Sequence, residues 1–276
     1  MNKYMKLVRF ELDRFWNFYL VLIGITVVLQ LTGAILLSKK YIAQANQIMY
    51  ENALSPAQFL EQYNSIPLYE QIISSWWIVG PVMICVVTLV IYVFFIWYRD
   101  WLGKNTFIYR LLMLPTTRMN LYFSKITTIM LMVFGLVAVQ IVLLIIENQI
   151  IQSIVPADLR LDSSIWEFPR YEWLSILIPR TFTEWMIYYS IGFMAVCVVF
   201  TAVLFERSFR WKGIILAIIY TVLSALVFIS PFFVHYSLDG YFYFAELLAL
   251  EILAGLIVTA GAMGTGNYLL KNKIRV

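Results

Sequence analysis

The sequence predicts an all-α integral membrane protein with six transmembrane helices. Of its 276 residues, 62% are hydrophobic and only 13% are charged, which is about half the charged share of an average soluble domain. A chain with so few charged residues cannot cover a water-facing surface. It also contains six apolar runs, and each is long enough to cross a bilayer core as a helix of roughly 20 residues.

The six runs lack Asp, Glu, Lys and Arg over almost their whole length, as expected of helices that satisfy their own backbone hydrogen bonds in lipid. The last run is expected to begin near Ala245 and so to include Glu246 and Glu251. No long linker or short repeat divides the chain, so 1–276 is predicted to be a single transmembrane domain. The predicted spans are about 18–37, 78–97, 126–146, 185–205, 213–234 and 245–270.

Positive charge is concentrated in alternate segments between the spans. If the N-terminus is inside, 15 of the 20 Lys and Arg residues lie in cytoplasmic segments, together with only four of the 16 acidic residues. Lys and Arg are retained on the cytoplasmic side during insertion. Both termini are therefore predicted to be cytoplasmic.

The first 16 residues place apolar and basic side chains largely on different faces of a helix. Tyr4, Val8, Leu12 and Phe15 share the apolar face, and this spacing predicts an amphipathic helix in the inner membrane interface. The alternative is that these residues form the basic start of the first span. No A-x-A-like cleavage site follows the first apolar run, so it is expected to remain as a membrane helix.

Two segments predicted to lie outside, 38–77 and 147–184, are long enough to fold. The first has polar sequence of helical character, and the second carries several Trp and Pro residues. Long loops of this kind are often functional. Their residues do not indicate a substrate.

The cytoplasmic segment 98–124 is too long for a tight turn between two helices. Apolar residues within 107–114 predict a short helix, which Pro115 ends because the residue before a proline is disfavoured in the helical region. Thr116 or Thr117 can cap the helix that follows. The short helix is either an element that a soluble partner grips or one that packs in the lipid interface.

This segment resembles the first cytoplasmic loop of ABC-2-type permeases, the membrane subunits of ATP-binding-cassette transporters. The family pattern there is an acidic residue, a Gly/Thr turn, then LL-x-LP-[ST]-R and a Lys at the start of the third helix. The layout of six spans with both termini inside is similar as well. The residues that carry the resemblance are Asp100, Gly103, Thr106, Leu112, Leu114, Pro115, Thr116, Thr117, Arg118, Tyr122 and Lys125.

The resemblance implies an exporter of several subunits in a bacterial cytoplasmic (plasma) membrane. Two permease subunits, as a homodimer or a heterodimer, would pair with cytosolic ATPase subunits that bind ATP and Mg. Membrane lipids are expected partners, and nucleic acid is not. Closure of the ATPase would reach the membrane through the short helix. The expected ATPase-coupling residues are Asp100, Phe107, Arg110, Leu111, Leu112 and Arg118.

The outer turn 231–244 holds Pro231, His235 and a run of four aromatic residues. In the resembled family, short re-entrant helices at this position plug the pathway; the alternative is an aromatic belt at the interface. Glu251 lies inside the predicted sixth span, where a carboxylate is costly and so a candidate for function. Its alternatives are to face water or to satisfy a neighbour. The expected pathway and outer-gate residues are Glu251, Glu246, His235, Tyr188 and Tyr220.

The sequence contains no motif for catalysis, nucleotide binding or metal binding. It lacks G-x-x-x-x-G-K-[ST], so no cofactor is expected in this chain and ATP hydrolysis is expected only in the partner. One His and two Cys exclude multi-His zinc sites and disulfide frameworks. The expected substrate is amphipathic: a membrane-active peptide, an antibiotic or a lipid-like molecule. The alternatives are a stand-alone proton-coupled transporter that uses Glu251 and a non-transporting membrane immunity or scaffold protein.

Overall fold

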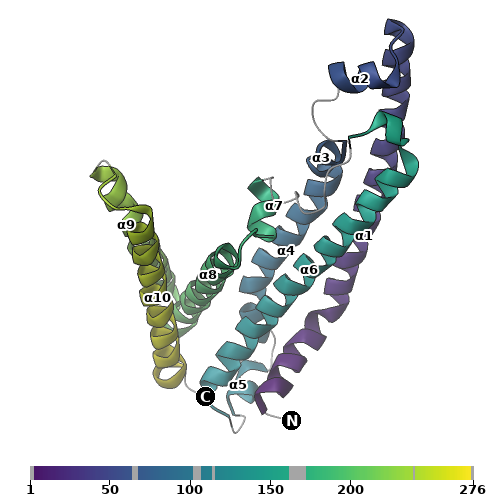
Figure 1. Ribbon diagram of the computed structural model, residues 1–276. Helices are drawn as coiled ribbons and strands as arrows, with labels where there is room; N and C mark the ends of the chain where they lie inside the picture. Colours follow the sequence, from purple (N-terminus) through teal and green to yellow (C-terminus); the bar gives the residue numbers. More distant parts are fainter. Residues whose placement is uncertain are drawn as a thin grey trace. The chain divides into compact units, whose positions relative to one another are not determined.

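The computed structural model of the protein describes residues 3–63, 68–101, 107–113, 116–161, 172–238 and 240–274. All regular structure within these ranges is helical, and Figure 1 shows the arrangement of the elements along the chain. The elements are α1 (Lys3–Asn52), α2 (Pro56–Tyr63), α3 (Leu68–Ile73), α4 (Trp76–Trp101), α5 (Phe107–Leu112), α6 (Arg118–Ile154), η1 (Ala157–Leu159), α7 (Glu172–Leu177), α8 (Phe182–Phe209), α9 (Trp211–Ser237), α10 (Phe244–Tyr268) and η3 (Leu269–Lys273).

Six helices in the described part of the chain are long and apolar enough to cross a membrane, which confirms the predicted number of spans. Each predicted apolar run falls within one of α1, α4, α6, α8, α9 and α10, the last continued by η3. Large apolar side chains such as Phe18, Ile91 and Leu256 are exposed on these helices. Such surfaces suit a lipid environment, so the protein is an all-helical transmembrane protein.

α1 is one continuous helix of 50 residues, which corresponds to about 75 Å at the helical rise. The hydrocarbon core of a bilayer is only about 30 Å thick, so α1 extends well beyond the predicted span 18–37. Residues 3–16, expected to form an interfacial helix or the start of the span, are its first turns. α6 likewise continues beyond 126–146, as far as Ile154.

The chain forms two compact units, and each combines segments that are distant in sequence. Unit 1 consists of Met1–Asp13, Val90–Met130 and Thr181–Val276. Unit 2 consists of Arg14–Leu89 and Leu131–Arg180. The helices α1, α4 and α6 therefore contribute one part to each unit.

Unit 2 packs parts of α1, α4 and α6 together with the short helices α2, α3 and α7. Close approach of α1 to α4 requires a glycine, because a Cβ on Gly33 would lie 2.5 Å from the Cβ of Trp77. The hydroxyl of Tyr69 in α3 donates to the carbonyl oxygen of Leu144 in α6 at 3.0 Å. The apolar core of this unit is formed by Ala45, Phe59, Leu68, Tyr69, Ile72, Ile73, Ile78, Leu144, Ile151, Val155, Leu159 and Leu174.

Unit 1 is centred on three buried aromatic side chains from α4, α6 and α8. The ring centroid of Phe200 lies 5.6 Å from that of Trp97 and 5.7 Å from that of Tyr122. The Tyr122 hydroxyl donates to the carbonyl oxygen of Cys197 at 3.1 Å. Edge-to-face contacts of this kind add to the free energy gained by burial, so these helices form a well-packed bundle.

Two connections in unit 1 bear on the sequence-based predictions. The short helix predicted within 107–114 is present as α5. Between α9 and α10, the described residues form no separate helix, because α9 runs to Ser237 and α10 begins at Phe244. Tyr241 and Tyr243 in this turn are exposed, which fits an aromatic belt.

Candidate functional site

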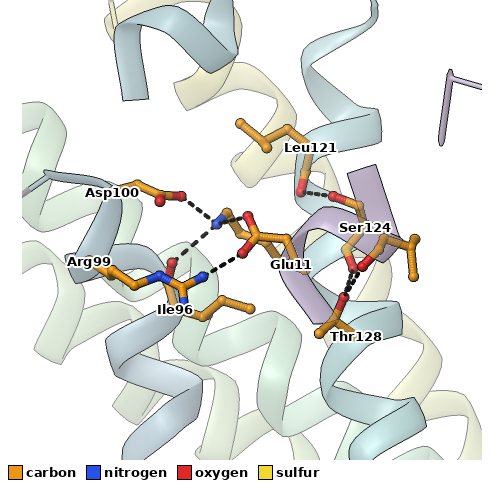
Figure 2. A network of polar contacts seen from close by, with 9 residues as sticks. Glu11, Ile96, Arg99, Asp100, Leu121, Ser124 and Thr128 are labelled. Atoms are coloured by element: carbon orange, nitrogen blue, oxygen red, sulfur yellow. Dashed lines mark hydrogen bonds and ion pairs between the residues drawn. The ribbon is translucent and has the colours of Figure 1, made fainter. Parts of the chain in front are cut away.

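Four charged side chains of unit 1 form a group, here called the ion cluster, in which three are buried and Arg99 is partly exposed: Glu11, Arg99, Asp100 and Lys125. Glu11 belongs to α1, Arg99 and Asp100 to the last turn of α4, and Lys125 to the start of α6. Figure 2 shows Glu11, Arg99 and Asp100 converging from their helices. The chain thus gathers ionisable groups from three helices at one place.

Lys125 is the centre of the ion cluster and has no exposed surface. Its Nζ donates to Asp100 Oδ2 at 2.5 Å, to Glu11 Oε1 at 2.7 Å and to the carbonyl oxygen of Ile96 at 3.1 Å. An ammonium group has three donors, so each of them has one acceptor. The Nζ also lies 5.2 Å from the ring centroid of Trp97, a cation–π contact.

Arg99 completes the charge balance of the ion cluster. Its Nη2 donates to Glu11 Oε2 at 2.6 Å, so both oxygens of the Glu11 carboxylate have a cationic partner. Two cations and two carboxylates make the cluster neutral. Removing ions from water costs several kcal/mol for each ion, and complete pairing offsets that cost. Loss of one member leaves an uncompensated buried charge.

Hydrogen bonds next to the ion cluster fasten the first turns of α1 to α6. The Thr128 hydroxyl donates to the carbonyl oxygens of Ser124 at 2.9 Å and Val8 at 3.5 Å. Tyr4 and Thr127 share a hydrogen bond of 2.5 Å between their hydroxyls. Figure 2 shows Ser124 and Thr128 beside Glu11. The start of α1 is therefore a packed part of unit 1.

α5 presents two different faces. Ile108, Leu111 and Leu112 are buried, whereas Arg110 in the helix and Met113 just after it are exposed. The side chain of Phe107 lies outside the described part of the structure. Among the predicted coupling residues of this helix, Arg110 is thus on the surface, while Leu111 and Leu112 hold the helix to unit 1.

The other two predicted coupling residues have internal partners. Asp100 is fully buried in the ion cluster. It therefore cannot contact an ATPase directly and can act in coupling only through that cluster. Arg118 donates through Nη1 to the carbonyl oxygen of Ile274 at 2.8 Å and also to that of Leu270. It ties the start of α6 to the end of η3.

Two of the predicted outer-gate residues lie at the turn between α9 and α10. His235 accepts a hydrogen bond at Nδ1 from the backbone N–H of Phe242 at 3.3 Å. Glu246 accepts one from the backbone N–H of Tyr243 at 3.0 Å, which satisfies a donor at the start of α10. An open pocket of about 660 Å³ includes Glu246 but not His235; it is lined by Tyr241, Phe242, Tyr243, Glu246, Ala249 and Leu250.

The structure does not bring the other predicted pathway residues into this pocket. Glu251 is half-buried on α10, and Tyr188 is exposed near the start of α8. The ring of Tyr220 packs on Phe205, with centroids 5.4 Å apart. Tyr220 precedes His235 by 15 residues of α9, or about 22 Å along the helix axis. These two residues therefore lie at different heights along α9.

Glu11, Arg99 and Lys125 were not among the predicted site residues, although the sequence contains a signal for the cluster. Lys and Arg dominate the segments predicted to be cytoplasmic, so the few acidic residues there are exceptional. Glu11 and Asp100 are ion-cluster members, and Glu206 accepts a hydrogen bond from the hydroxyl of Tyr98. Glu11 and Asp100 are thus the two acidic residues of these segments that are buried, whereas Asp13 lies in an exposed ion pair with Arg9 and Glu206 is half-buried.

The candidate site contains no arrangement suited to a metal ion. In the described ranges, no group of three or more His, Cys, Asp or Glu side chains comes together. What the ion cluster shows directly is charge pairing between side chains of α1, α4 and α6. The chain matches no family model, no curated protein and no solved structure.

Proposed function

We propose that the protein is the membrane-spanning permease subunit of an ABC exporter, in which a separate cytosolic subunit hydrolyses ATP. The exported substrate is amphipathic: a membrane-active peptide, an antibiotic or a lipid-like molecule. Six apolar helices support a transmembrane role. The sequence resemblance of 100–125 to an ABC-2 coupling loop, and the short helix α5 within it, favour the ABC class over other transporters.

One observation carries the proposal: the segment that holds α5 is closed by an internal ion pair. Asp100 precedes α5, Lys125 follows it, and their side chains are 2.5 Å apart in the buried ion cluster. A displacement of α5 is therefore transmitted to α4, α6 and the start of α1 through buried ion pairs that are costly to break. A coupling element needs this kind of connection.

The exposed side chains Arg110 and Met113 are the proposed contact with the ATPase. Arginine and methionine are both enriched in protein interfaces, and arginine is common among the residues that contribute most of the binding energy. The buried Leu111 and Leu112 act indirectly by holding α5 in place. Because the ATPase is a cytosolic subunit in this proposal, α5 has to face the cytoplasm. The charge bias of the sequence predicts the same orientation.

A pull-down from the native host tests this function. The tagged chain, purified in mild detergent, should retain a P-loop ATPase, identified by its sequence, and vanadate-sensitive ATPase activity. Arg110→Glu combined with Met113→Asp should reduce the retained ATPase at least tenfold, because it places two charges in the interface. Lys212→Glu, at an exposed position of α9, is the matched control and should retain it.

Two outcomes would refute the ABC assignment. One is a wild-type chain that retains no P-loop ATPase yet transports substrate. The other is unchanged retention by the double variant, which would remove α5 from the coupling role.

The alternative function, a stand-alone proton-coupled transporter, is favoured by the half-buried position of Glu251 in α10. An immunity or scaffold protein would bind its partner without transport.

A further inference from the structure

Glu147 lies in unit 2, on the face of α6 that packs into the apolar core. Leu144, Ile151 and Val155 belong to that core and are three, four and eight residues away from Glu147. Side chains at these spacings share one face of a helix. Glu147 has no exposed surface, so a carboxyl group occupies a core position.

Neither oxygen of the Glu147 carboxyl group has a hydrogen-bond partner among the residues that the structure describes. Tyr69 of α3 is the titratable group that faces Glu147, and burial raises the pKa of Tyr69. The Tyr69 hydroxyl donates to the carbonyl oxygen of Leu144 at 3.0 Å rather than to Glu147. No described Lys or Arg pairs with Glu147, in contrast to the paired carboxylates of the ion cluster.

The next polar side chain along this face of α6 is too far away to serve as a partner. Gln140 precedes Glu147 by seven residues, or about 10 Å along the helix. Its Oε1 already accepts a hydrogen bond from Gln30 of α1 at 3.0 Å. Among the described residues, Glu147 therefore has no hydrogen-bond partner and lies in largely apolar surroundings, with Tyr69 as the titratable group that faces it.

An isolated carboxylate in an apolar interior is far more costly than the neutral acid. We propose that Glu147 is a proton-binding site: the folded chain holds it as a neutral carboxylic acid, and loss of the proton loosens the packing of α3 against α6. The ligand is a proton because Glu147 has no second carboxylate beside it among the described residues with which to hold a metal ion, and a proton needs no cavity.

The pH dependence follows from proton uptake on folding. In the unfolded chain an ordinary Glu is ionised at neutral pH, whereas the packed unit 2 holds the acid form. Folding of this unit therefore takes up one proton, so raising the pH destabilises it and acidification stabilises it. Glu147→Gln removes the titration and keeps nearly the same shape.

Infrared spectroscopy of the purified full-length chain tests the protonation state. At about pH 7 the wild type should show a carbonyl band of protonated carboxyl, and Glu147→Gln should lose it. Glu51→Gln is the matched control, because Glu51 is an exposed carboxylate of the same unit. Glu251→Gln shows whether Glu251 contributes to the band. If Glu147→Gln does not fold, Glu147→Asp keeps the acid and should shift the band.

Thermal unfolding gives a second, independent readout. The midpoint of the wild type should fall between about pH 5 and about pH 9, and that fall should be absent or clearly smaller in Glu147→Gln. Absence of the carboxyl band from the wild type, or an equal pH dependence in both proteins, would overturn the proposal. Neither readout involves transport or an ATPase, so the result is independent of the proposed exporter function.

Discussion

Lys125 Nζ lies 2.5 Å from Asp100 Oδ2, and neither side chain has exposed surface. The pair joins α4 to α6 across 25 positions of the chain. It is stable because the ion cluster as a whole is neutral and each donor of Lys125 has an acceptor. The pair is therefore sensitive to any change that unbalances the cluster.

Lys125→Met should lower the free energy of unfolding by about 3–5 kcal/mol, because Glu11 and Asp100 would then share one cation in a buried site. Denaturant unfolding in mixed micelles measures this loss. The matched control is Arg9→Met, which breaks an exposed ion pair with Asp13 at 3.8 Å. Its effect should stay below about 1 kcal/mol.

A double variant checks the physical cause of that loss. Asp100→Leu combined with Lys125→Met leaves the neutral pair of Glu11 and Arg99, so the double variant should be more stable than Lys125→Met alone. A double variant that is less stable than either single variant would show that packing of the side chains, and not charge balance, determines the stability of the cluster.

The spans could be predicted because few backbone structures satisfy their own hydrogen bonds inside a lipid bilayer. An uncharged apolar run of about 20 residues has to be a helix, and all six predicted runs lie in long helices. The ends of α1 and α6 were harder to predict, because residues beyond the spans are polar and their helicity depends on tertiary contacts. One such contact joins Tyr41 to the carbonyl oxygen of Leu159 at 2.7 Å.

The site could be predicted only in part, because its members are distant in sequence. Asp100 and Lys125 both belong to the local pattern around α5, whereas Glu11 and Arg99 enter the sequence analysis only as charges of their segments. The same reasoning placed Glu147 in an outer segment rather than in a core. Charge and hydropathy describe what surrounds a residue along the chain, but its spatial neighbours depend on how the helices pack.

Gly33 should not tolerate a larger side chain. Gly33→Ala places a Cβ 2.5 Å from the Trp77 Cβ. Such overpacking should lower the free energy of unfolding by about 1–3 kcal/mol. Gly24→Ala is the matched control in the same helix, because a Cβ there would meet nothing within 4 Å. Gly24→Ala should be neutral or stabilising by up to about 1 kcal/mol. Thermal unfolding of both variants measures the difference.

If Gly33→Ala is as stable as Gly24→Ala, then α1 and α4 are not in close contact at this point.

The charge bias predicts which helix ends face the cytoplasm. The two native cysteines, Cys85 and Cys197, are buried and can be replaced by alanine. In that background, a cysteine at Asn52 should react with an impermeant maleimide added to intact cells, and a cysteine at Lys212 should react only after lysis. Both positions are exposed, so accessibility reports the side of the membrane. Labelling of the Lys212 position in sealed cells would reverse the orientation.

Glu251 distinguishes the two transporter mechanisms, because it is a half-buried carboxylate within α10. If ATP drives export, this group needs only to shape or hydrate the pathway. Glu251→Gln keeps its size and hydrogen bonding, so export of a labelled membrane-active peptide should fall less than about tenfold, or about 1.4 kcal/mol. Glu246→Gln is the control, since an amide oxygen can still accept from the Tyr243 N–H.

If protons drive transport, Gln at position 251 cannot bind and release a proton, and coupled transport should disappear. Loss of transport in Glu251→Gln, together with loss in the wild type when a protonophore is added at constant ATP, would exclude the ABC mechanism.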